Sequence, residues 1–193
     1  MTQEKAITVY GASSSHIDPS YFEAARQVGA AIARRGFAVV NGGGSMGLMG
    51  ASIDGALAEG GRAIGILPEF MMARGWGHPK LTRTEVVADM HERKKRMAEL
   101  ATGVIALPGG MGTYEELFEI MTARQLGLFT GNIVLLNTNG YYDPLLALLR
   151  HTYEQHFMNE DHFRQIITVT ADPEEAVRIA ATPAQPHTYS LKF

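Results

Sequence analysis

The sequence TGVIALPGGMGTYEELFEIMTARQ, from Thr102 to Gln125, contains the signals that decide the fold. Its residues 104–107 are apolar without polar alternation, which is typical of a parallel strand buried on both faces. Pro108 ends this strand, and a glycine-rich loop follows. We expect a helix to begin at Thr113, because apolar residues then recur at helical spacing. These residues are Leu117, Ile120 and Met121.

A glycine loop between a buried strand and a helix is typical of an anion site. The amides at a helix N-terminus point outward, the helix dipole adds partial positive charge, and missing side chains let a phosphate approach closely. We therefore expect a phosphate at the amides of residues 110–113, with the Thr113 hydroxyl as a further donor. Glu115 and Glu116 are placed in the first helical turn, beside that phosphate. Thr113 to Glu116 also fits the capping box S/T-x-x-E, which explains Glu116 without any ligand.

Length and composition limit the class of protein. With 193 residues, 46% hydrophobic and 19% charged, we expect one soluble globular domain over residues 1–193. The net charge of −3 gives no global basic field for nucleic acid or an anionic membrane. The absence of cysteine excludes disulfides, thiolate zinc sites and a cysteine nucleophile. We find neither a leader-like N-terminus nor an apolar run of ~18 residues, so a cytoplasmic protein is expected.

Strand and helix patterns alternate along the whole chain. We expect strands at residues 6–10, 37–40, 63–67, 85–88, 104–107, 132–138 and 166–170. We expect helices at residues 19–35, from the second glycine loop to 59, and at 89–101, 113–125, 142–157 and 172–181. This alternation predicts a single-domain α/β fold, a doubly wound (Rossmann-like) parallel sheet with helices on both faces. Ligands of such sheets bind outside the carboxyl ends of the strands. The last ~10 residues are expected to form a tail.

Arg93 lies on the apolar side of its predicted helix, three residues after Met90 and four before Met97. An arginine on an inner face needs an anionic partner, because burying it unpaired is costly. From spacing alone, a structural salt bridge is the favoured partner and an anionic ligand the alternative. Residues 69–84 show no periodicity, so we expect a lid beside the site, with packing of Trp76 on the core as the alternative.

A second glycine loop also allows two interpretations. Gly42-x-Gly44-x-x-Gly47 follows a strand, opens a helix and precedes Glu69 by about the spacing of a dinucleotide-binding fingerprint. Taken alone, it would suggest an NAD enzyme. The chain has a better glycine loop at 109–112 and is short for a separate substrate domain, so we interpret the 42–47 loop as shaping the nucleoside part of the same crevice.

Three blocks of the sequence carry a resemblance to one family. Residues 108–116, PGGMGTYEE, match PGGxGTxxE, the signature of the Lonely Guy (LOG) family. Residues 89–94, DMHERK, and residues 42–50, GGGSMGLMG, look like two further family blocks in the family's order. LOG members resemble cytokinin-activating nucleoside 5′-monophosphate phosphoribohydrolases, and many carry the older label "lysine decarboxylase".

The resemblance implies a hydrolase of N-glycosyl bonds that releases free base and ribose 5-phosphate from AMP or N6-modified AMP (cytokinin ribotides). Arg93 and Glu116 are the expected catalytic residues. The carboxylate would stabilise oxocarbenium charge or activate water, and the fixed charge of arginine suits an orienting and electrostatic role. The expected substrate-binding residues are Lys94, Gly109, Gly110, Met111, Gly112, Thr113, Tyr114, Glu115, Thr122, Gly43, Gly44 and Ser14. For Thr122 the alternative is a mid-helix threonine whose hydroxyl bonds to the preceding turn.

The alternative function is a non-catalytic nucleotide or molybdenum-cofactor carrier on the same fold. A carrier needs the amide loop but not the carboxylate, so the presence of both Arg93 and Glu116 favours the enzyme. Pyridoxal phosphate chemistry needs a Schiff-base lysine with a partner for the pyridinium nitrogen, a context that Lys94 and Lys95 lack. No cofactor is therefore expected.

The resemblance implies a homodimer with sites near the interface, and we expect no nucleic acid or membrane partner. The seven histidines show no metal-ligand spacing, so no metal is expected. The acidic residue of the plant members' lid region has no clear counterpart among residues 75–79, which leaves the preferred base open.

Overall fold

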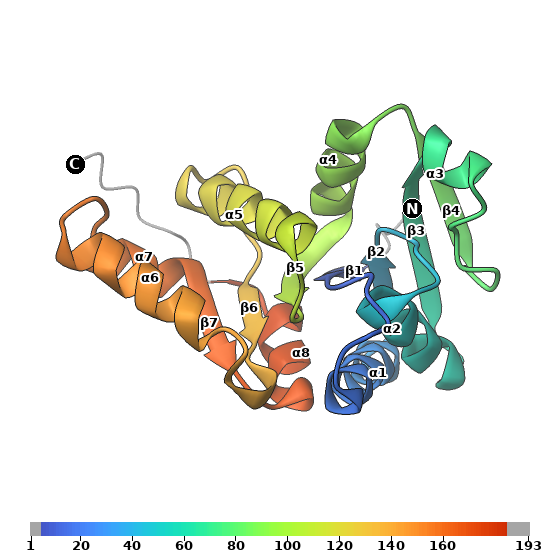
Figure 1. Ribbon diagram of the computed structural model, residues 1–193, viewed down its shortest axis with the longest axis horizontal. Coiled ribbons are helices and arrows are strands. Elements are labelled where there is room, and N and C mark those ends of the chain that lie inside the picture. Colours follow the sequence, from blue (N-terminus) through green and yellow to red (C-terminus); the bar gives the residue numbers. More distant parts are fainter. Residues whose placement is uncertain (1–4, 185–193) are drawn as a thin grey trace.

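A parallel sheet of seven strands runs through residues 5–184, the part of the chain that the computed structural model describes (Figure 1). The strands are β1 (Ala6–Tyr10), β2 (Ala38–Asn41), β3 (Arg62–Pro68), β4 (Arg83–Val87), β5 (Ala101–Ala106), β6 (Ile133–Leu136) and β7 (Ile167–Thr170). The helices are α1 (Pro19–Arg34), α2 (Gly47–Ala58), α3 (Glu69–Ala73), α4 (Met90–Leu100), α5 (Met111–Gln125), the 3-10 turn η1 (Thr138–Gly140), α6 (Asp143–Glu154), α7 (Glu160–Ile166) and α8 (Pro173–Ala181).

The strand order is β4-β3-β2-β1-β5-β6-β7, with every pair parallel. The chain therefore builds outward from β1 to β4, returns to the other side of β1 as β5, and builds outward again. β1 and β5 pair in register from Ile7–Gly103 to Tyr10–Ala106. Between the carboxyl ends of these two strands the winding direction reverses, which is where open α/β sheets bind their ligands.

Helices cover both faces of the sheet (Figure 1). On β1 the side chains alternate, so Ile7 and Val9 pack toward α1, α2 and α8, while Tyr10 packs toward α4, α5 and α6. Both clusters are almost completely shielded from solvent, which explains the continuous apolar strands of the sequence. The predicted fold class is confirmed. The predicted tail falls largely outside the described residues.

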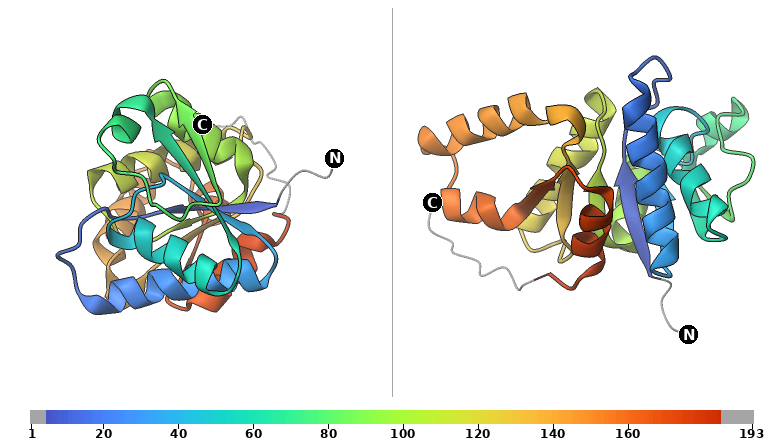
Figure 2. Two further views of the ribbon diagram at one scale, coloured as in Figure 1. Left: turned by 90° about the vertical axis from the view of Figure 1, so that its right-hand side faces the viewer. Right: turned by 90° about the horizontal axis from the view of Figure 1, so that it is seen from below.

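α1 and α2 lie side by side, as both views of Figure 2 show. Two glycines permit this close contact. A Cβ on Gly29 would stand 1.9 Å from the Ser52 carbonyl oxygen, and one on Gly55 would stand 2.1 Å from that of Arg26. On the inner face of α1, Val28 and Ile32 are completely buried.

Several boundaries differ from those expected, and two helices were not expected. α5 begins at Met111 rather than Thr113, because Gly110 already has the extended backbone of a helix N-cap and accepts the first helical bond from Tyr114. The helix expected to reach residue 157 ends at Glu154, where the left-handed backbone of His156 (φ 62°) stops it without a glycine to signal the stop. α3 and α7 were not predicted, because such short helices give little periodicity.

Candidate active site

A cavity of about 680 Å³ opens at the carboxyl ends of the central strands. The loops after β1, β2, β3 and β5 meet there, together with the first turns of α4 and α5. This is the position that the doubly wound topology predicts. Its lining residues are Gly11, Ala12, Ser13, Gly42, Gly44, Ser45, Met46, Met49, Leu67, Met71, Gly75, Trp76, Met90, Arg93, Gly110, Met111, Gly112, Thr113 and Glu116.

The N-terminus of α5 faces this cavity with residues 110–113. No side chain among residues 5–184 caps this helix end, so its first amides have no side-chain capping partner there. Thr113 is buried against the loop, and a Cβ on Gly109 would stand 2.1 Å from the Thr113 Oγ1. The arrangement leaves backbone donors directed at a ligand, with glycines on either side of Met111.

The capping-box interpretation of Glu116 is wrong. Because Gly110 is the N-cap, Thr113 is the third residue of α5 and not its cap, and Glu116 lies in the second turn. The expectation of Glu115 and Glu116 in the first turn is wrong for the same reason. The Glu116 carboxylate consequently cannot act as the reciprocal cap of the helix start, and its position requires another explanation.

Arg93 and Glu116 form a buried ion pair in the wall of the cavity. Arg93 Nη1 lies 3.5 Å from Glu116 Oε1, and the two side chains are only 7% and 11% exposed. Arg93 Nε donates to the Ile66 carbonyl at 3.1 Å. The guanidinium fills the space beside Gly42, where a Cβ would stand 1.5 Å from Nη2. The inward direction predicted for Arg93 is confirmed, and both the salt bridge and access to a ligand are present.

Burial raises the pKa of Glu116 to about 7, although the Arg93 charge counteracts part of this effect. Lys94 also lowers this pKa, whereas Glu115 and Glu119 raise it. A carboxyl group with a pKa near neutrality can take up and return a proton in one catalytic cycle. Such a shift in a cavity wall is typical of an acid–base residue.

Several residues expected to bind substrate do not line the cavity. Lys94 Nζ lies 2.7 Å from Glu115 Oε1 and 2.6 Å from Glu119 Oε2, in a bridge from α4 to α5. Thr122 Oγ1 donates to the Phe118 carbonyl at 2.8 Å, as its structural interpretation predicted. Ser14 is exposed and accepts a bond from the backbone of His16.

Three more of these residues support the loops from behind. The Tyr114 hydroxyl donates to the Tyr141 hydroxyl at 3.2 Å. The Gly109 carbonyl accepts from Tyr141. Gly43 has a left-handed backbone (φ 71°) and donates to the Asn41 side chain at 2.8 Å. Direct contact of all these residues with substrate stays a prediction, whereas residues 110–113 and Gly44 do face the cavity.

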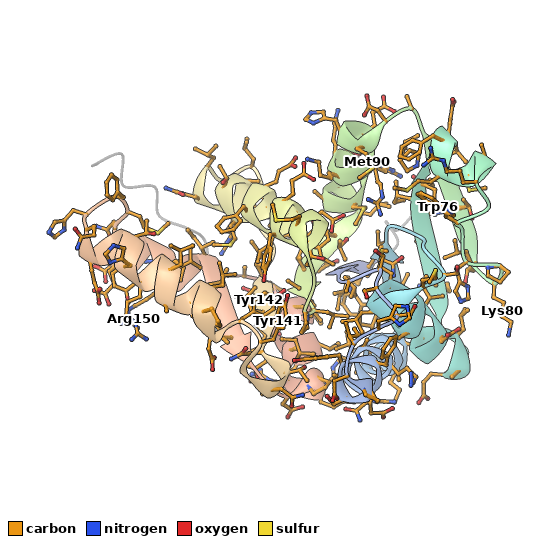
Figure 3. The ribbon with its side chains drawn as sticks, viewed as in Figure 1. Trp76, Lys80, Met90, Tyr141, Tyr142 and Arg150 are labelled. Carbon is orange, nitrogen blue, oxygen red and sulfur yellow. The ribbon has the colours of Figure 1, made fainter. Side chains whose placement is uncertain are left out.

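One part of the cavity wall is apolar. Four methionines contribute to it, and Figure 3 shows one of them, Met90, with Trp76 at the same end of the molecule. Trp76 is 48% exposed, so its packing on the core is ruled out. Sequence reasoning missed this wall because its residues come from separate elements of the chain. The only signal in the sequence was that most of them are methionines. These residues are Met46, Met49, Leu67, Met71, Trp76 and Met90.

The segment expected to be a lid is tied to the second glycine loop. Ser45 N donates to the Trp76 carbonyl at 3.2 Å, and His78 N donates to the Gly43 carbonyl at 2.8 Å. The His78 ring lies 3.1 Å from Asp54 on α2, and Arg74 stacks over Trp76 at 5.0 Å. The segment therefore forms one side of the cavity.

The second glycine loop is shaped by protein contacts. Arg93 occupies the space beside Gly42, and a Cβ on Gly47 would stand 2.3 Å from the Ala12 carbonyl. The amide of Leu48, in the first turn of α2, already donates to Ala12 at 2.7 Å. Contacts within the protein thus account for Gly42 and Gly47 of the dinucleotide-like pattern without a pyrophosphate, and the role of this loop in the nucleoside part of the crevice stays a prediction.

In residues 5–184 no group of three or more His, Cys, Asp or Glu side chains is placed to hold a metal ion. Within the same residues no helix has both the length and the apolar character needed to cross a membrane.

The fold and the site together define a doubly wound α/β protein with a glycine-lined helix N-terminus beside a buried arginine–glutamate pair. A family model described as "Possible lysine decarboxylase" matches residues 49–180. A Rhodococcoides fascians protein named cytokinin riboside 5′-monophosphate phosphoribohydrolase is 41% identical over 180 residues, covering 93% of this chain and 90% of the relative. An Arabidopsis thaliana protein of the same name, LOG7, is 42% identical over 175 residues, covering 90% of this chain and 80% of the relative.

The chain therefore belongs to the Lonely Guy (LOG) family, for which "lysine decarboxylase" is an older label. Among solved structures, the molybdenum cofactor binding protein of Rippkaea orientalis superimposes with a TM-score of 0.71 at 21% identity, covering 92% of this chain and 96% of that protein. This likeness shows a shared fold.

Proposed function

We propose that this protein is a phosphoribohydrolase that cleaves the N-glycosidic bond of AMP or of N6-modified AMP, including cytokinin ribotides. The products are the free base and ribose 5-phosphate. Relatives about 40% identical over most of the chain bear the name of this activity. The observation that carries the proposal is the buried Arg93–Glu116 pair, 3.5 Å apart, in the wall that also holds the N-terminus of α5.

In this proposal each part of the cavity has a task. The amides of residues 110–113 hold the 5′-phosphate, because they are uncapped donors at a helix N-terminus. The ribose then lies between this loop and Glu116. The apolar wall with Trp76 and Met90 receives the base and its N6 substituent.

In the reaction, a water oxygen bonds to the anomeric carbon while the bond from this carbon to the base nitrogen breaks. The electron pair of the broken bond leaves with the base. The Glu116 carboxylate takes the water proton and stabilises the positive charge that develops on the sugar. The base nitrogen is protonated from Glu116 or solvent, so that one water is consumed in each cycle. Arg93 keeps its charge throughout and orients Glu116 and the substrate.

Decarboxylation by pyridoxal phosphate has no support from the cavity. A Schiff-base lysine must reach the bound cofactor. None of the described residues that line the cavity is a lysine, and Lys94 is held between two glutamates on α5. Two further features belong to the proposal: a homodimer with a mass twice 21.0 kDa, and a location in the cytoplasm, where nucleoside monophosphates are metabolised.

The test is release of ribose 5-phosphate from a panel of nucleoside 5′-monophosphates. We expect Glu116→Gln and Arg93→Ala each to lower kcat by at least about 100-fold with folding intact, because a group acting in the transition state contributes at least about this factor. Glu23→Gln is the matched control, since it makes the same chemical change on the exposed face of α1. If the unmodified protein binds AMP but releases nothing from any nucleotide, it is a carrier.

A further inference from the structure

The loop between β5 and α5 is held from behind by three hydrogen bonds to successive carbonyl groups. The Tyr142 hydroxyl donates to the Leu107 carbonyl at 2.7 Å. The Ala12 amide donates to the Pro108 carbonyl at 3.1 Å. The Tyr141 hydroxyl donates to the Gly109 carbonyl at 2.5 Å. The two tyrosines lie beneath α5 in Figure 3, far along the chain from the loop that they hold.

The bond from Tyr141 has a consequence for the next amide. The carbonyl of Gly109 and the N–H of Gly110 belong to one planar peptide group. No peptide bond in the described residues is cis, so these two groups point in opposite directions. Since Gly110 lines the cavity, fixing the carbonyl from behind directs the Gly110 N–H toward a ligand in front.

The Tyr141 side chain is itself fixed in place. Its hydroxyl accepts a bond from Tyr114, and its ring packs edge-on against Tyr21 at 6.0 Å and Tyr142 at 5.2 Å. Burial and the Tyr114 hydroxyl raise the pKa of Tyr141 to about 12. The hydroxyl therefore keeps its proton, and remains a donor, over the whole range in which the enzyme would work.

We propose that Tyr141 is a positioning residue that aims the Gly110 amide at the 5′-phosphate of the substrate. This inference rests on the proposed function, because it takes the α5 N-terminus as the phosphate site. Without this bond the 109–110 peptide is less restrained, because glycine has no side chain to limit its backbone dihedral angles. An N–H donor that is already oriented loses less conformational entropy when the phosphate binds, so the phosphate binds more tightly.

The adjacent Tyr142 provides a matched comparison. Its hydroxyl holds the Leu107 carbonyl, but the nitrogen of that peptide group belongs to Pro108 and carries no hydrogen. Tyr142 is completely buried, so loss of its hydroxyl leaves an acceptor unpaired in the core. The two tyrosines thus make the same kind of bond, and only the bond from Tyr141 directs an amide.

The experiment compares Tyr141→Phe with Tyr142→Phe by calorimetric binding of ribose 5-phosphate, AMP and adenosine. For Tyr141→Phe we expect the Kd of ribose 5-phosphate and AMP to rise about 5- to 10-fold, the size of one ordinary net hydrogen bond, because the Gly110 amide is misaligned rather than removed. Adenosine, which lacks the phosphate, should bind as it does to the unmodified protein. KM for the nucleotide should rise by the same factor while kcat changes by less than about twofold. For Tyr142→Phe we expect a lower Tm with all three Kd values unchanged.

Tyr114→Phe is a second variant, which removes only the donor to the Tyr141 hydroxyl and should shift the same Kd values in the same direction by a smaller factor. The inference is overturned if Tyr141→Phe lowers Tm while phosphate binding stays unchanged, or if adenosine binding weakens equally. It is also overturned if the unmodified protein does not bind ribose 5-phosphate. The proposed function fails separately, when bound AMP is not cleaved, and in that case the effect of Tyr141 on phosphate binding is still measured.

Discussion

At the scale of single residues, the site depends on a carboxyl group that is destabilised in its charged form. Glu116 is nearly buried, and its ion-pair partner Arg93 lies 3.5 Å away and is itself held by the Ile66 carbonyl. Burial raises the pKa of Glu116 more than Arg93 lowers it, and the result is about 7. Ionisation of Glu116 therefore lowers the stability of the folded state. A pKa near neutral pH is, however, the value that suits a catalytic proton acceptor.

The first prediction concerns activity and pH. If the Glu116 carboxylate is the proton acceptor, kcat/KM should fall about tenfold for each pH unit below about 7 and level off above it, because only the ionised form accepts the water proton. The measurement is kcat/KM for AMP or the best nucleotide of the panel between pH 5 and 9. A profile that is flat between pH 5 and 8 would contradict this role of Glu116.

The second prediction concerns stability and pH. At pH values between 4.5, the ordinary pKa of a glutamate, and about 7, Glu116 is protonated in the native state and ionised in the unfolded chain. Stability from this group is thus present below pH 4.5 and lost as pH rises to 7. Glu116→Gln removes the effect, so its free energy of unfolding relative to the unmodified protein should be higher at pH 8 than at pH 5, by up to about 3 kcal/mol, as measured by denaturant unfolding at both pH values. Glu23→Gln should show the same difference at both pH values.

At the scale of elements, the functional residues of α4 and α5 lie next to the residues that link these two helices to each other. Arg93 and Glu116 meet in the cavity wall, and the following residue on α4, Lys94, is held between Glu115 and Glu119 of α5. The Lys94 side chain is only 12% exposed, so these ion pairs are better shielded than ordinary surface pairs. The geometry makes Lys94 a link that sets the spacing of the two helices.

The third prediction tests this link. Lys94→Met removes both ion pairs and leaves Glu115 and Glu119 uncompensated near Glu116, which is also faced by Arg93 and the buried Tyr10. We expect kcat to fall about tenfold, the equivalent of about 1.4 kcal/mol. The acid limb of the pH profile should move to higher pH, because Lys94 lowers the pKa of Glu116.

Lys95→Met is the matched control, because Lys95 is 72% exposed and its single pair, with Glu99, spans 3.9 Å. It should leave kcat and the pH profile unchanged. A Lys94→Met variant that raises only KM, with an unchanged acid limb, would instead assign Lys94 to substrate binding, as the family resemblance implies.

At the scale of the whole molecule, the cavity joins the two halves of the sheet. Loops after β1, β2 and β3 line one side, and the loop after β5 lines the other, so a bound nucleotide contacts both halves at once. A ligand that binds only the folded state stabilises it by mass action.

The fourth prediction follows from this arrangement. At a concentration 100 times its Kd, AMP should stabilise the protein by about 2.7 kcal/mol, which corresponds to a rise in Tm of about 5 to 10 °C for a chain of this size. The measurement is a thermal melt with AMP, ribose 5-phosphate or adenine, all at the molar concentration used for AMP, because equal multiples of each ligand's own Kd would stabilise the protein equally. Free adenine, which cannot reach the phosphate loop and the base wall together, should give a smaller shift, and an equal shift for all three would contradict a site that spans both halves.

The sequence by itself determined the class of fold, the glycine loop between a buried strand and a helix, and the inward direction of Arg93, since apolar periodicity and glycine placement are local properties. It also contained the three family blocks around Arg93 and Glu116. Only the tertiary structure decided that Glu116 is not a helix cap, that Lys94 joins two helices, and that Tyr141 holds the Gly109 carbonyl. The methionine wall with Trp76 was likewise decided there. For Lys94, Tyr141 and the methionine wall the physical reason is the same. Their contacts join residues that are distant along the chain, and only the folded structure brings these residues together.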